Sequence, residues 1–76
     1  MNNITDIIIH IDENLNDQKI TEVSNQLSHN KGVVSVGRNP RTPKFLMVVY
    51  NTGRTQSKKI LNAVTDLGYR ASLVGM

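Results

Sequence analysis

The stretch KFLMVVY (residues 44–50) carries the strongest strand signal in the chain. One lysine is followed by an unbroken run of aromatic, β-branched and long apolar side chains, a composition typical of a strand. Successive side chains of a strand point to opposite faces, so one face takes Leu46, Val48 and Tyr50. The alternate positions are apolar too, which predicts that both faces of this strand are apolar.

A hairpin precedes this strand and a helix follows it. Residues 33–38 (VVSVGR) predict a second strand, and residues 39–43 (NPRTP), with two prolines, predict the turn between the two strands. Thr55 is a candidate N-cap of the following helix, and Gly68 is expected to end it. A last strand is predicted at residues 69–74. The apolar stripe of this helix is formed by Ile60, Leu61, Val64 and Leu67.

The N-terminal part of the chain predicts one more strand and one more helix. Residues 6–11 (DIIIHI) are rich in isoleucine and predict a strand. A polar loop at 12–15 leads to Asn16, a plausible N-cap, and residues 30–32 (NKG) supply the stop signal. Ile20, Val23 and Leu27 form the apolar stripe of the helix expected between Asn16 and residues 30–32.

The order strand-helix-strand-strand-helix-strand predicts an α+β fold of the ferredoxin-like βαββαβ type. Two interleaved β-α-β halves with right-handed crossovers form a four-stranded antiparallel sheet with two helices on one face. The loops are short, so residues 1–76 are expected to form a single domain.

Composition excludes several classes of function. The chain has no cysteine, which rules out a disulfide scaffold, a thiolate metal site and a cysteine nucleophile. No apolar run is long enough for a membrane span and no signal peptide is visible, so we expect a cytoplasmic protein. Residues 1–30 hold one cation and five acids, a charge of −4, whereas residues 31–76 hold eight cations and one acid, a charge of +7.

The sequence resembles the heavy-metal-associated domains of copper chaperones and metal-transporting ATPases. The resemblance is carried by the Val-x-Val rhythm that follows Gly32-Val33, by the apolar strand ending at Tyr50, and by the pattern Ile60-Leu61-x-x-Val64-x-x-Leu67-Gly68-Tyr69. It covers nearly the whole chain. The resemblance implies the same ferredoxin-like fold.

The same family binds soft metals through a Met-x-Cys-x-x-Cys motif in the loop that opens the first helix. The corresponding positions here are Asn14, Asn16 and Lys19, and none of them supplies a sulfur ligand. Since Cu(I) prefers thiolate or thioether ligands, the copper chemistry of the family is not expected to transfer. The resemblance therefore supports the fold more than it supports the metal function.

Other side chains near this loop offer a different ligand set. His10, Asp12, Glu13 and Asp17 supply an imidazole and three carboxylates, which suit Zn(II) or a similar ion. The alternative is an ordinary solvated strand end. The expected cofactor is none, with a divalent metal at these four residues as the alternative.

The second face of the strand at 44–50 points to a protein partner. Phe45, Met47 and Val49 lie on it, and Ile8 of the first strand is expected beside them. An antiparallel sheet that faces water usually carries polar side chains there, so an apolar open face suggests a contact surface for a partner or a second copy.

The sequence does not indicate an enzyme. Ser24, Ser28 and His29 near one helix end are expected to be capping or surface residues, and no glycine-rich phosphate loop is present. RNA-binding domains of this topology stack bases on aromatic residues of the sheet face, and here Phe45 alone is expected there.

The most favoured function is thus a non-catalytic accessory or protein-interaction module. Metal handling without cysteine is the second reading, and nucleic-acid or small-molecule binding is the third. The basic side chains that would contact phosphate in that third reading are Arg38, Arg41, Lys44, Arg54, Lys58 and Lys59.

Overall fold

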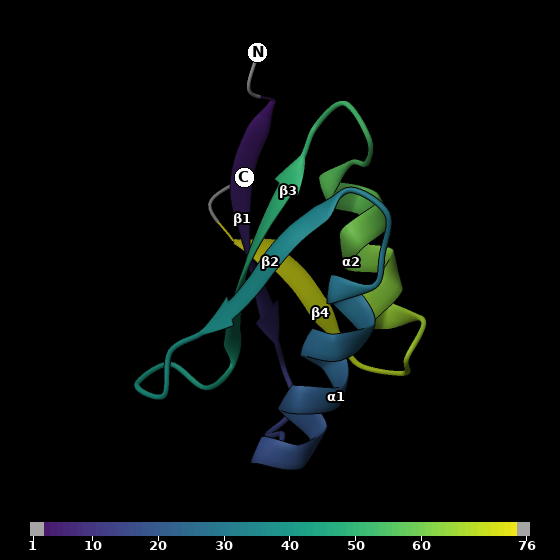
Figure 1. Ribbon diagram of the computed structural model, residues 1–76. Helices are drawn as coiled ribbons and strands as arrows, with labels where there is room; N and C mark the ends of the chain where they lie inside the picture. Colours follow the sequence, from purple (N-terminus) through teal and green to yellow (C-terminus); the bar gives the residue numbers. More distant parts are fainter. Residues whose placement is uncertain (1–2, 75–76) are drawn as a thin grey trace.

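The computed structural model describes residues 3–74 and contains two helices and a four-stranded antiparallel sheet, as predicted (Figure 1). The single domain expected for residues 1–76 stays a prediction. In chain order they are β1 (Ile4–Ile11), α1 (Asp17–Ser28), β2 (Val33–Arg38), β3 (Phe45–Asn51), α2 (Ser57–Thr65) and β4 (Ala71–Val74).

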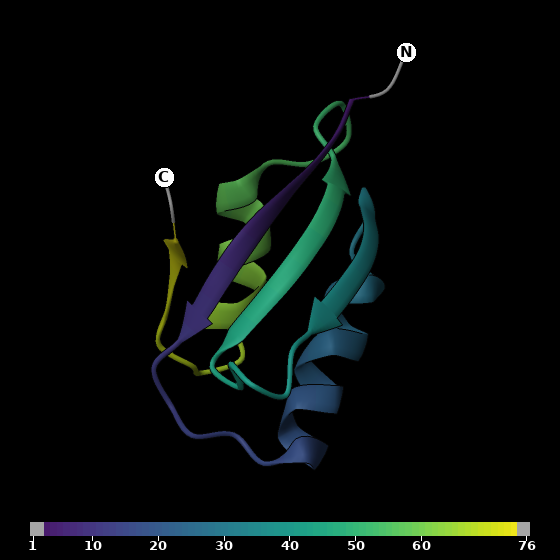
Figure 2. The ribbon, with the colours of Figure 1, turned by 90° about the vertical axis from the view of Figure 1, so that its left-hand side faces the viewer.

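The strands are arranged in the order β2-β3-β1-β4, so β3 and β1 form the centre of the sheet. Figure 2 shows the sheet with both helices behind it, which leaves the other face open. Ile8 of β1 lies opposite Met47 of β3 on one side and Val74 of β4 on the other. Three strands therefore bring their open-face side chains together.

The core lies between the sheet and the helices. The face of β3 predicted to be buried is buried, and so is one face of β1. Since burying one such aliphatic side chain contributes about 1.5–3 kcal/mol, this layer is the main source of stability. The buried apolar residues are Ile7, Ile9, Ile11, Ile20, Val23, Leu27, Leu46, Val48, Tyr50, Ile60 and Val64.

The predicted bounds of the second helix were wrong at both ends. Its N-cap position is Gln56, not Thr55, and the Gln56 side chain makes no capping hydrogen bond. Thr55 instead packs in the interior, with its amide donating to the carbonyl of Asn51 (3.1 Å). The helix ends at Thr65, so Leu67 lies beyond it and is exposed.

β1 and β4 also differ from their predicted limits. β1 begins at Ile4 rather than residue 6, because β3 reaches Asn51 and pairs with it along its full length. β4 begins at Ala71 rather than residue 69. No helix within residues 3–74 is long and apolar enough to cross a membrane. The cytoplasmic location stays a prediction.

Candidate functional site

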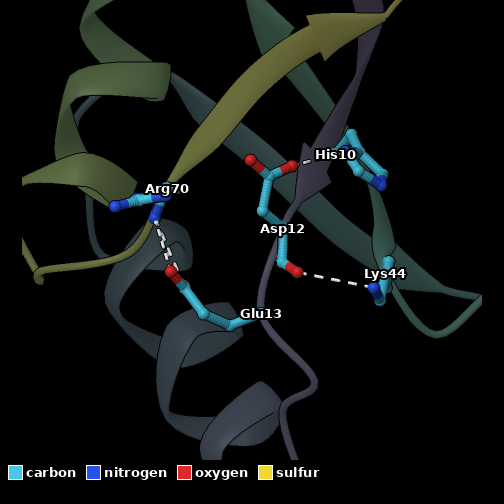
Figure 3. Close-up of polar contacts among 5 residues, drawn as sticks. All are labelled: His10, Asp12, Glu13, Lys44 and Arg70. Atoms are coloured by element: carbon cyan, nitrogen blue, oxygen red, sulfur yellow. Dashed lines mark hydrogen bonds and ion pairs between the residues drawn. The ribbon is translucent and has the colours of Figure 1, made fainter.

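The end of β1 brings two of the four candidate metal ligands together. The Nδ1 atom of His10 lies 3.1 Å from Oδ1 of Asp12 (Figure 3). The ring of Phe45, on the neighbouring strand, lies 4.9 Å from the imidazole, centroid to centroid. His10 is thus held between an exposed carboxylate and an aromatic ring.

The other two candidate metal ligands, Glu13 and Asp17, contact different residues. Both carboxylate oxygens of Glu13 lie 3.2 Å from the backbone nitrogen of Arg70, and Figure 3 shows this side chain pointing toward β4. Oδ1 of Asp17 lies 3.2 Å from the guanidinium of Arg38. Within residues 3–74, no three His, Asp or Glu side chains gather closely enough to hold a metal ion.

The three positions that match the thiolate motif of the metal-binding family serve the start of α1 or face solvent. Asn16 is the N-cap, and its Oδ1 accepts a hydrogen bond from the backbone N–H of Lys19 (2.8 Å). Asn14 is exposed. An amide already engaged in capping and a nearby ammonium do not fit a soft metal ion, which prefers sulfur.

The open sheet face exposes apolar side chains of three strands. Ile8 is 40% exposed, Met47 45% and Val74 42%, and the strand register places Ile8 between the other two. Val49 and Phe45 are half-buried on the same face. The four predicted interface residues, Ile8, Phe45, Met47 and Val49, therefore share this face.

A hollow of about 330 Å³ lies in this face, next to the turn between β2 and β3. Ile8, Phe45 and Met47 supply its apolar lining. Gly37 of β2 lies opposite Met47, and a Cβ atom built there would meet nothing within 4 Å. The missing side chain of Gly37 thus leaves the hollow open on one side.

One basic residue lines the hollow and two more lie in or beside the adjoining turn. Arg38 lines it, and Arg41 lies in the adjoining turn, where its backbone N–H donates to Oδ1 of Asn39 (2.9 Å). Lys44 reaches back toward the loop after β1, with its Nζ 3.4 Å from the carbonyl oxygen of Asp12 (Figure 3). Three basic residues therefore lie at or near this end of the open face, with Asp12 and Asp17 as acidic neighbours.

Sequence reasoning missed three residues that line the hollow, namely Gly37, Asn39 and Thr42. A glycine within a strand often marks a close approach by another group, so Gly37 was a usable signal. Val49 was predicted to belong to the interface but does not line the hollow.

The polar residues at the end of α1 are engaged in closing the helix. The hydroxyl of Ser28 donates to the carbonyl oxygen of Asn25 (2.8 Å), and Nδ1 of His29 lies 2.6 Å from the same oxygen. This arrangement agrees with the capping role expected from the sequence.

No protein-family description matches the sequence, and no curated protein matches it either. Solved structures do match. The chain is similar to oxidized MerP from Ralstonia metallidurans, with 20% identity, a TM-score of 0.83, and coverage of 93% of this chain and 97% of that one.

Two copper proteins are similar as well. The yeast copper transporter domain shares 17% identity at a TM-score of 0.80, covering 91% of this chain and 93% of that one. The copper chaperone of Enterococcus hirae shares 16% identity at a TM-score of 0.79, and the match covers 90% of this chain and 98% of that one. At these identities the likeness shows the fold alone, which is that of small metal-chaperone and metal-transporter domains.

Proposed function

We propose that this chain is a non-catalytic protein-interaction module whose open sheet face receives an apolar side chain from an acidic segment of a partner protein. The hollow between Ile8, Phe45 and Met47 carries the proposal. Its volume, about 330 Å³, falls at the lower end of the roughly 300–1,000 Å³ typical of ligand pockets.

Contiguity of the exposed apolar side chains supports a contact surface. Ile8, Met47 and Val74 are strand neighbours, so their exposed areas join, whereas singly scattered apolar residues are normal on any surface. Joined apolar area on a small protein is typical of an interaction site.

The charges around the hollow indicate the kind of partner. Arg38 lines the hollow, and Arg41 and Lys44 lie in or beside the turn next to it. The exposed Asp17 is the ion-pair partner of Arg38, and Lys44 contacts the backbone of Asp12. Exposed ion pairs of this kind contribute about 0–1 kcal/mol, so a partner's carboxylate can replace Asp17 at little cost. An acidic segment is therefore favoured over a basic one.

Binding of a divalent metal ion is the second candidate, and the His10–Asp12 pair is the observation that favours it. The similar structures include a mercury-bound form of MerP and a copper-loaded domain, but those names describe those proteins. Zinc sites in proteins use three or four protein ligands, and this pair supplies two. We therefore place metal binding second.

A peptide titration followed by NMR tests the interaction proposal. The probe is a synthetic peptide with one leucine flanked by glutamates, and its counterpart carries lysines in place of the glutamates. We expect saturable shifts of the amides of Ile8, Gly37 and Met47 with the acidic peptide and not with the basic one.

Two strand variants provide the matched controls. Gly37→Val fills the hollow from its open side and should weaken peptide binding by about tenfold, equivalent to about 1.4 kcal/mol. Ser35→Val adds a similar side chain to the same strand but lies outside the hollow and should leave binding unchanged. Equal effects of the two substitutions would count against the hollow as the binding site.

Self-association is the competing use of this face. Sedimentation at high protein concentration should show a monomer. A dimer that is lost in Met47→Lys would mean that the face receives a second copy of the chain, and the proposal of a different partner would then be wrong.

A further inference from the structure

A second hollow lies on the helix side of the molecule, away from the open sheet face. It has a volume of about 390 Å³ and runs along α2 beside the turn between α1 and β2. In Figure 1 this turn lies next to α2. Its polar lining includes Lys31, Arg54, Thr55, Lys59, Asn62 and Asp66.

Gly32 fixes the geometry of this groove. Its φ of +92° lies in the region that favours glycine, and its carbonyl oxygen accepts a hydrogen bond from the amide of Asn51 (2.8 Å). A Cβ atom on Gly32 would lie 2.9 Å from the methyl of Thr55 and 3.0 Å from Cβ of Arg54. The backbone next to Lys31 is therefore pressed against residues 54 and 55, although the two segments are far apart in sequence.

Three cations from separate segments line the groove: Lys31 from the turn, Arg54 from the loop after β3, and Lys59 from α2. The ion pairs found between residues 3 and 74 involve none of them. Asp66 lines the groove too, but it follows Lys59 by seven residues, roughly 10 Å along a helix. The groove thus has a basic end and an acceptor-rich end.

Thr55 lies at the basic end of the groove, beside Arg54. Its side chain is 9% exposed and its methyl faces Gly32. Thr55 also lines the groove, which places a hydroxyl-bearing side chain at this end.

We propose that this groove binds a phosphate group, either as inorganic phosphate or as the monoester of a small organic molecule. A guanidinium can bind two phosphate oxygens at once, two ammonium groups add charge, and the threonine hydroxyl donates a further hydrogen bond. Asn62 and Asp66 would accept hydrogen bonds from hydroxyls on the organic part. The site lies on the other side of the sheet from the peptide site and does not depend on it.

A titration of the full chain at constant ionic strength tests the site. Inorganic phosphate and glycerol phosphate are the probes, and backbone amides are followed by NMR. We expect saturable shifts at Lys31, at residues 54–59 and at Asn62, with a dissociation constant of about 1 mM or lower for the better probe. Tighter binding of glycerol phosphate would identify a monoester as the ligand, and equal affinities would identify the free ion.

Neighbouring lysines provide a matched control. Lys59 lines the groove and Lys58, one residue before it on the same helix, does not. Lys59→Gln and Arg54→Gln should each weaken binding by about tenfold. Lys58→Gln removes the same charge and should change the affinity less than twofold.

Thr55→Val tests the hydroxyl separately, because valine keeps the buried shape. It should weaken phosphate binding several-fold while the rest of the NMR spectrum stays native. The proposal is wrong if the shifts do not saturate, if Lys58→Gln and Lys59→Gln weaken binding equally, or if an oligonucleotide binds and neither small probe does.

Discussion

Gly32 and Gly68 occupy the same backbone region in different surroundings. Both have positive φ, +92° and +98°, which a residue with a Cβ adopts at a cost of about 1–2 kcal/mol. A Cβ at Gly68 would meet nothing within 4 Å, whereas at Gly32 it would press on Arg54 and Thr55. Replacing either glycine by alanine should cost backbone strain, whereas only the replacement of Gly32 should add crowding.

We predict that Gly32→Ala destabilises the protein more than Gly68→Ala does. Gly68→Ala should cost about 1 kcal/mol from the backbone alone. Gly32→Ala should cost a further 1–2 kcal/mol, roughly the penalty of overpacking. Urea unfolding followed by circular dichroism measures both, and equal losses would show that the turn at Gly32 moves freely away from Thr55.

Among the elements, α1 and α2 begin in different ways. Asn16 caps α1 through its side chain, and Asp17 places an acid in the first turn. The cap position of α2, Gln56, makes no side-chain bond, and the first turn of α2 has no acid. The start of α1 is therefore the one that a single substitution can weaken.

Asn16→Ala should lower the free energy of unfolding by about 1 kcal/mol, since the hydrogen bond to the N–H of Lys19 is lost. Asn14→Ala, two residues earlier on an exposed position, should change it by less than about 0.5 kcal/mol. Thermal and urea unfolding compare the two. A large loss of stability in Asn14→Ala would mean that Asn14 has a structural role that its exposed position does not explain.

Sequence periodicity predicted the elements better than their ends. The alternation in β1 and β3 and the helical spacing of Ile20, Val23 and Leu27 follow directly from burial on one face. The start of α2 was missed because the amide of Thr55 bonds to the carbonyl of Asn51 in the preceding turn, and its side chain packs against Gly32, which is far away in sequence.

The candidate sites were predictable to different degrees. The apolar open face could be read from the alternation in β3, but the hollow depends on the turn at 39–43 folding beside Gly37. The basic groove joins Lys31 to Arg54, and only the folded chain brings that pair together. Local sequence holds no signal for such a pair.

At the scale of the whole molecule, the fold is shared with metal-binding proteins while the ligands are not. We predict that Cu(I) gives no saturable shifts of the amides of residues 10–19, because Asn14, Asn16 and Lys19 offer no sulfur. NMR titrations with Cu(I), Zn(II), Cu(II) and Ni(II) check this. Saturable shifts that vanish in His10→Ala and persist in His29→Ala would instead establish metal binding at the end of β1.

The place of β1 in the sheet also bears on how the chain acquires its structure. β1 is synthesised before its two partners, and it pairs with β3 and with β4, so that Ile8 lies opposite Val74. Contacts this distant in sequence raise the contact order, which slows folding. During translation the isoleucine-rich β1 therefore has no strand partner until β3 has left the ribosome, and it lacks its second partner until β4 follows. In this period a nascent chain is exposed to aggregation and to chaperones.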